Sequence, residues 1–108
     1  MSEQMELTEK NCGQYVNTKF RVRGAAEEPV ELELVEVKGY HPGQNEQEGM
    51  ERFSLFLQGP AEAYLPQNTY ALEHESLGSH LLFMVPVARN EQGFRYEIVF
   101  NYFRKSEE

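Results

Sequence analysis

The chain has 108 residues, with 18 acidic against 10 basic side chains and a formal net charge of −8. Every acidic residue is Glu, because the sequence contains no Asp. This composition excludes Asp dyads, Ser-His-Asp triads and the Asp-rich EF-hand loop from the chain itself. The length predicts one domain. The negative charge argues against nucleic acid or an anionic membrane as a partner, since Lys and Arg would have to bind it.

The N-terminal residues and the single cysteine bear on location. The first residues are polar and acidic, unlike a signal peptide. No apolar run approaches the roughly 18 residues of a membrane span, so we expect a cytoplasmic protein. Cys12 is the only cysteine, which excludes a disulfide within the chain. Its neighbours match no signature of a nucleophile, and we expect a small, partly buried residue.

The first element in chain order is a short helix, with Thr8 as its N-cap, Glu9 at its first position and Gly13 at its end. From Thr18 onward apolar residues recur at every second position, as in strands with one face in the core. The sequence predicts six strands, over residues 18–23, 30–38, 52–58, 69–75, 79–87 and 94–103.

The second predicted strand has a break in its alternation. Its apolar residues occupy even positions as far as Leu34 and odd positions from Val35 onward. Because a shift of one residue inverts every later side chain, we expect a bulge or bend here. Pro86, in the fifth strand, cannot donate to a β-ladder, so we expect it at an edge or a bulge.

The short strands and frequent turns predict an all-β fold in a single domain of residues 1–108. Residues 1–6 and 104–108 are polar, and we expect frayed tails. Residues 39–51 are polar and Gly-rich, and we expect a long exposed loop. The strands should form a six-stranded antiparallel meander that closes as a barrel or a barrel-like sandwich, and the break within a strand favours the barrel.

No constellation of residues predicts catalysis, a metal or a cofactor. On a strand, His74 points away from its neighbours Glu73 and Glu75, so this segment alone cannot chelate a metal. The sequence also lacks a nucleophile elbow and a phosphate-binding Gly-rich loop. We therefore expect neither a metal nor a cofactor, and the sequence favours a protein that is not an enzyme.

Two functional hypotheses remain open. The first is an interaction or assembly module, because some apolar residues fall on the face opposite the predicted core. These residues are Phe56, Leu82, Met84 and Phe103. If exposed, they would form a patch that binds a protein partner or a second copy of the chain.

The second hypothesis is a small barrel that binds a ligand, or performs chemistry, at its mouth. Its candidate site consists of Gln67, Tyr70, His74 and Glu97. This site requires that the four side chains converge.

Five ordered motifs give the chain a resemblance to a family. They are Phe53–Pro60, Leu65–His74, Leu77-Gly78, Leu82–Val87 and Tyr96–Asn101. With them the chain resembles an uncharacterised family of small bacterial domains, over nearly its whole length. Relatives in this family tend to be encoded near phage-tail-collar-like proteins, so the resemblance implies a part in a tail-like or fibre assembly.

Overall fold

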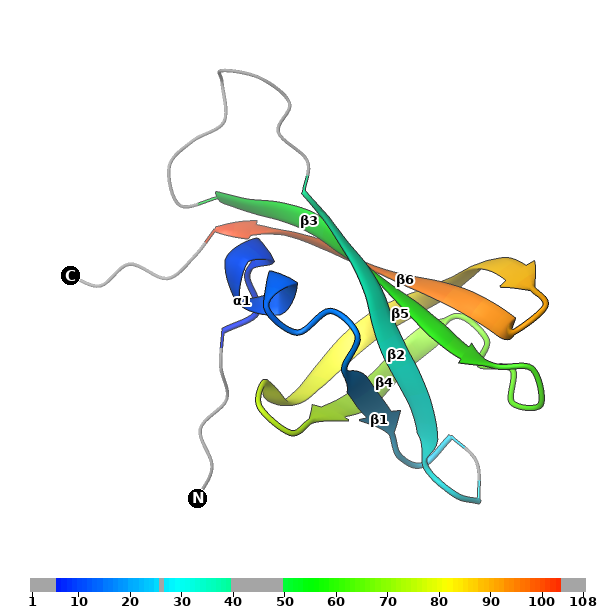
Figure 1. The fold of residues 1–108 in the computed structure, drawn as a ribbon. Helices are drawn as coiled ribbons and strands as arrows, with labels where there is room; N and C mark the ends of the chain where they lie inside the picture. Colours follow the sequence, from blue (N-terminus) through cyan, green and yellow to red (C-terminus); the bar gives the residue numbers. More distant parts are fainter. Residues whose placement is uncertain (1–5, 26, 40–49, 104–108) are drawn as a thin grey trace.

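The computed structural model describes residues 6–25, 27–39 and 50–103. Within them, six antiparallel strands close into a barrel, and a short helix lies at one end (Figure 1). The elements are α1 (Glu9–Gly13), β1 (Lys19–Val22), β2 (Val30–Gly39), β3 (Met50–Pro60), β4 (Asn68–His74), β5 (Gly78–Asn90) and β6 (Gly93–Phe103). The predicted barrel, its six strands and the N-terminal helix are confirmed.

The predicted tails and the predicted long loop lie largely outside the described residues. The ranges that are not described there are 1–5, 40–49 and 104–108. The predicted loop over residues 39–51 is too long at both ends. Gly39 still belongs to β2, and Met50 and Glu51 already belong to β3, since each has a partner across the sheet.

The order of strands around the barrel is β1-β2-β3-β6-β5-β4, and β4 pairs with β1 to close it. The predicted meander is therefore wrong at one connection, because β3 pairs with β6 rather than with β4. The chain leaves β3 at Pro60 and enters β4 at Asn68, on the far side of β6 and β5. Leu65 anchors this crossing in the core, and its backbone N–H donates to the Tyr96 hydroxyl at 2.9 Å.

Two bulges bend the sheet where the sequence predicts them. The register of β2 against β3 shifts between Leu34 and Glu36. The shift lets Val37 pack against the core although Leu34, three residues earlier, is also buried there. The register of β5 against β6 shifts between Pro86 and Ala88, which places the proline at a bulge.

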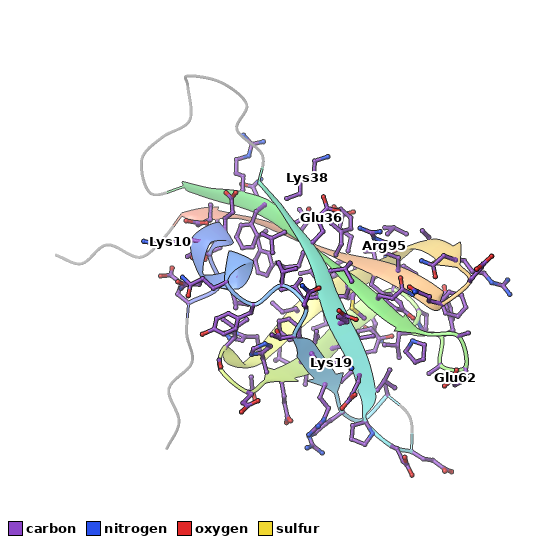
Figure 2. All side chains as sticks on the ribbon, viewed as in Figure 1. Lys10, Lys19, Glu36, Lys38, Glu62 and Arg95 are labelled. Atoms are coloured by element: carbon purple, nitrogen blue, oxygen red, sulfur yellow. The ribbon has the colours of Figure 1, made fainter. Side chains whose placement is uncertain are left out.

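Apolar side chains from all six strands fill the barrel (Figure 2). The largest of the fully buried side chains are Tyr96, Phe20, Phe53, Leu32, Leu34, Leu55, Leu57, Leu72, Leu77, Met84, Ile98 and Val22. Each such side chain contributes about 1.5–3 kcal/mol relative to an exposed one. In the same view, Glu36, Lys38 and Arg95 lie on the outside of the wall. No helix in the described part of the chain is long and apolar enough to cross a membrane.

The N-terminal segment covers one end of the barrel. Thr8 caps α1 as predicted, since its hydroxyl accepts a backbone N–H of the first turn at 3.0 Å. The helix packs against β2 and β3. The backbone N–H of Glu9 donates to Glu51 Oε1 at 3.0 Å, and the Tyr102 hydroxyl donates to the Leu7 carbonyl. The segment is thus tied to the ends of β3 and β6.

Candidate functional site

The four residues of the predicted ligand site do not converge. Tyr70 and His74 lie on the inner face of β4, whereas Gln67 is exposed in the connector before it. Gln67 and His74 flank opposite ends of a strand about 20 Å long. Glu97 lies on the outer face of β6, between the buried Tyr96 and Ile98, and its Oε2 accepts a hydrogen bond from a Ser54 hydroxyl at 2.7 Å. Side chains on opposite faces of the wall cannot line one site.

His74 is engaged at both ring nitrogens. Nδ1 accepts the backbone N–H groups of Ser76 and Leu77, at 2.9 and 3.0 Å, so it carries no proton. The proton of the neutral ring is therefore on Nε2, which lies 2.7 Å from the Thr18 hydroxyl oxygen. That hydroxyl donates in turn to the Tyr15 carbonyl. The chain of hydrogen bonds joins the β4–β5 turn to the segment before β1.

Burial lowers the pKa of His74, and the nearby Glu75 carboxylate only partly opposes this. The imidazole packs against the Tyr15 and Phe20 rings, with centroids 5.2 and 4.9 Å away. A second proton would enter at Nδ1, where two N–H donors already point. The arrangement therefore favours the neutral ring and a structural role for His74.

We expect the free energy of unfolding to fall as the pH drops below 6.5, the ordinary pKa of histidine. Because the pKa of His74 is lower in the folded state, the unfolded chain takes up the proton first. The stabilisation is complete above the unfolded pKa and is lost as the pH falls through the folded one. Urea unfolding at several pH values between about 5 and 7.5 measures this slope.

The variant His74→Asn should flatten the slope, because the Asn Oδ1 can accept the same two backbone N–H groups without titrating. His80→Asn is the matched control: His80 is half-buried and lies near the Leu77 carbonyl. A slope that persists unchanged in His74→Asn would contradict the prediction.

Cys12 is fully buried, and burial together with the nearby Glu51 carboxylate raises the pKa of its thiol to about 12. The thiol stays protonated at neutral pH and packs as a small apolar side chain. The sequence predicts a partly buried residue, whereas the structure places Cys12 fully in the core. In the part of the chain described by the structure, no three His, Cys, Asp or Glu side chains are grouped to hold a metal ion.

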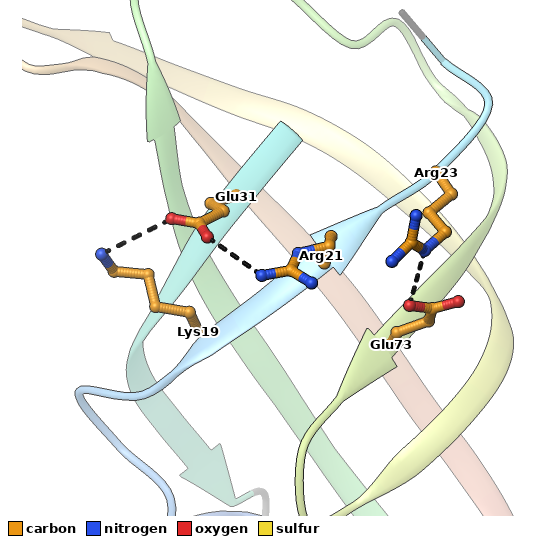
Figure 3. Close-up of polar contacts among 5 residues, drawn as sticks. All are labelled: Lys19, Arg21, Arg23, Glu31 and Glu73. Atoms are coloured by element: carbon orange, nitrogen blue, oxygen red, sulfur yellow. Dashed lines mark hydrogen bonds and ion pairs between the residues drawn. The ribbon is translucent and has the colours of Figure 1, made fainter. Parts of the chain in front are cut away.

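Two open hollows of about 840 and 880 Å³ flank β1. Ion pairs occupy the strand between them (Figure 3). Lys19 Nζ and Arg21 Nη2 lie 3.9 and 3.4 Å from the Glu31 carboxylate, and Arg23 Nε lies 2.7 Å from Glu73 Oε1. Exposed pairs of this kind contribute about 0–1 kcal/mol each. Lys19, Arg21 and Glu31 line both hollows, whereas pockets that bind small molecules are mostly lined by apolar side chains.

The predicted outward orientation is correct for Phe56 and wrong for Leu82 and Met84. Phe56 lies on the outer wall of β3, half-covered by the Arg95 guanidinium at 5.2 Å from its ring centroid. Met84 is fully buried and Leu82 packs against the core. The side chain of Phe103 lies outside the described part of the structure.

The large exposed apolar residues of β5 lie at its odd positions. Leu81 is 74% exposed and Phe83 is 53% exposed, while Val99 on β6 is 63% exposed. We call these three residues the outer patch. The residues opposite the first two on β4, Ala71 and Thr69, are uncharged as well.

The outer patch flanks the point where β5 and β6 part. The last residues paired between these strands are Val85 and Glu97. Phe83 precedes Val85 by two residues and Val99 follows Glu97 by two, so both keep the outward orientation. Large exposed apolar groups in one area of a soluble domain mark interaction sites.

The sequence pattern missed this patch because the run 81–87 is apolar at nearly every position. Alternation alone cannot say which face of such a strand is inside. The register with β4 decides it: Leu72, in the core, lies opposite His80, and Tyr70 lies opposite Leu82. Pairing β4 with β5 residue by residue from the turn at Gly78 would have placed the even positions of β5 opposite the even, inward-facing positions of β4.

Comparison with known proteins identifies a family. No curated protein and no solved structure matches the chain. The model of a family described as a domain of unknown function, DUF6916, matches residues 7–100, which include α1, β1 to β5 and most of β6. The predicted resemblance to an uncharacterised family is thereby confirmed, and the chain belongs to the DUF6916 family of domains of unknown function.

Proposed function

We propose that the protein is a non-enzymatic interaction or assembly module that docks a protein partner through the outer patch. The observation that supports this is the exposure of Leu81 and Phe83 on the outer face of β5 and of Val99 on the outer face of β6. Apolar area left in water costs about 25 cal/mol per Å² relative to burial. A partner that covers these side chains would recover this free energy.

The surroundings of the outer patch suit a protein surface as the partner. Its three side chains and their neighbours Ala71 and Thr69 are uncharged, although 26% of the chain is charged. Docking there would not bury an unpaired charge, the most costly kind of desolvation.

The ligand-binding alternative has less support. Its four residues lie on different faces of the wall, and both nitrogens of His74 form hydrogen bonds within the protein itself.

We place the assembly module in the cytoplasm. This compartment is reducing, which suits a chain whose one cysteine is a free thiol. The resemblance to relatives encoded near phage-tail-collar-like proteins favours a tail-like or fibre structure as its setting.

Capture of partners from the host of origin tests the proposal. Tagged wild-type protein should retain a specific partner, and the double variant Leu81→Ser/Phe83→Ser should lose at least about tenfold of it, as expected for residues central to an interface. Tyr64→Ser is the matched control, because Tyr64 is 54% exposed but lies in the connector between β3 and β4. Circular dichroism verifies that each variant is folded. Equal capture by the wild type and the double variant, or capture by neither, would contradict the proposal.

A further inference from the structure

The turn between β4 and β5 is held by two histidines, one on either side of it. His74 ends β4, and its Nδ1 accepts the backbone N–H groups of Ser76 and Leu77, at 2.9 and 3.0 Å. His80 lies in β5, and its Nε2 is 2.8 Å from the Leu77 carbonyl oxygen. Because a carbonyl oxygen only accepts, Nε2 of His80 carries a proton and donates this hydrogen bond. One histidine therefore binds the N–H of Leu77, and the other binds its C=O.

The two histidines respond differently to acid. Nδ1 of His74 accepts only while it carries no proton, so the imidazolium form loses both hydrogen bonds to the turn. Nε2 of the same ring carries a proton in either form and still donates to Thr18. His80 likewise donates through Nε2 in either form, so a proton on its other nitrogen leaves the contact with Leu77 in place. Protonation thus removes the contacts that His74 makes with the turn and no others.

The position of Leu77 determines what the loss of these contacts does. Its side chain is fully buried in the core, and the hydrogen bond from its N–H is buried too. A buried N–H without an acceptor is costly, so this group has to reach water. It reaches water when the turn moves outward, and that movement draws the Leu77 side chain out of the core. Glu75 and Ser76 already face solvent, so Leu77 is the residue of the turn whose surroundings change most.

The surroundings of His74 oppose its protonation while the turn is closed. In the described part of the chain, the titratable and charged groups around it are Tyr15 before β1, Lys19 and Arg21 of β1, Glu31 of β2, Glu73 of β4, Glu75 of the turn and His80 of β5. Four of these groups take part in the ion pairs of Figure 3. Burial lowers the pKa of His74 more than the Glu75 carboxylate raises it. An open, solvated turn therefore takes up the proton at a higher pH than the closed one.

We propose that His74 is a proton-dependent switch for the β4–β5 turn. A proton at Nδ1 releases the N–H groups of Ser76 and Leu77, and the turn opens while the barrel stays closed. The ladder between β4 and β1 and the hydrogen bond to Thr18 do not involve Nδ1, so they are kept. Protonation of histidines near pH 5–6 operates acid-sensing switches of this kind. The switch does not depend on the partner proposed for the outer patch.

Native-state amide hydrogen exchange, measured by NMR between about pH 5 and 7.5, tests the switch. After correction for the intrinsic exchange rate, the protection of the Leu77 amide should fall by up to about tenfold for each pH unit below 6.5, because the open turn binds one proton more. Amides in the paired stretches of β3 and β6 should stay at least about a hundredfold more protected. Low concentrations of urea should speed the exchange of those amides and leave that of Leu77 unchanged, since a local opening exposes little surface.

His74→Asn should make the protection of the Leu77 amide independent of pH, since the Asn Oδ1 accepts N–H groups without titrating. His80→Asn is the matched control, because His80 contacts the carbonyl of the same residue. This control should keep the pH dependence of the wild type. The wild-type measurement decides the question even if one of the variants does not fold.

Three results would each overturn the switch. The first is wild-type protection of the Leu77 amide that does not change over this pH range. The second is exchange at Leu77 that rises with urea as steeply as that of the β3 and β6 amides, because the turn would then open only together with the whole barrel. The third is a pH dependence that persists in His74→Asn, which would assign the proton to another group.

Discussion

Replacing Phe20 with Ala is expected to lower the free energy of unfolding by about 3–5 kcal/mol. Phe20 is fully buried in β1, the strand that closes the barrel between β2 and β4. It lies opposite Leu32 on one neighbour and His74 on the other. Because β1 has only four residues, few other contacts hold this seam, and the cavity left by the ring could not be filled without opening it.

Urea unfolding followed by circular dichroism or tyrosine fluorescence measures the loss, since the chain has no Trp. Phe83→Ala is the matched control: it removes the same atoms from a side chain that is 53% exposed on the outer wall. It should cost less than about 1 kcal/mol. Equal losses in the two variants would mean that Phe20 is not central to closure of the barrel. A loss of 3–5 kcal/mol is a large part of the roughly 5–15 kcal/mol that holds a domain folded.

Replacing Gly93 with Ala is expected to cost about 3 kcal/mol or more. The residue has a φ of +144°, a backbone conformation that is open almost only to glycine. A Cβ on it would lie 2.2 Å from the Gly59 carbonyl oxygen and 2.6 Å from the Pro60 carbonyl carbon. These are backbone atoms at the end of β3, so relief requires the β5–β6 turn to move away from its partner strand.

Gly13→Ala provides the comparison within the same chain. A Cβ at Gly13 would meet nothing within 4 Å, and alanine is favoured over glycine in a helix by up to about 1 kcal/mol. This variant should be as stable as the wild type or slightly more stable. Thermal unfolding of both variants, monitored by circular dichroism, measures the difference. A Gly93→Ala protein with wild-type stability would show that the turn can reorganise freely.

The expected effect of each replacement depends on whether the residue contacts the rest of the chain or faces solvent. Phe20 and Gly93 act where the chain meets itself, so their replacement changes the free energy of folding. Phe83 and Val99 act where the chain meets solvent or a partner, so their replacement should change binding and leave folding largely intact. Because of this separation, the outer patch can be tested with folded variants.

Local features of the chain could be predicted because their causes lie within a few residues. Alternation of apolar residues indicates most of the strands, whatever their neighbours are. The break at Leu34 predicts a bulge or bend because a slip would otherwise invert the strand, and Pro86 predicts an edge or a bulge because it cannot donate to the ladder. Thr8 predicts the start of α1 through the hydrogen bond that its hydroxyl accepts.

The candidate site could be predicted only in part, for the same reason. The outward position of Phe56 follows from the clear alternation of Phe53, Leu55 and Leu57 around it. The run from Leu81 to Val87 has no such polar positions, so its pattern is compatible with either face inward. Pairing with β4 places Leu82 and Met84 inside and leaves Leu81 and Phe83 in solvent.

The sequence by itself therefore determined an acidic all-β domain with six strands, two irregular positions in them and a capped helix. It also excluded catalytic and metal sites that are built from Asp. Only the tertiary structure decided the order of the strands and the exposed face of β5. The physical reason is that pairing between strands distant in the chain depends on the free energy of the whole closed barrel. Alternation within a strand carries information about one side chain and its near neighbours, and none about which strand lies beside it.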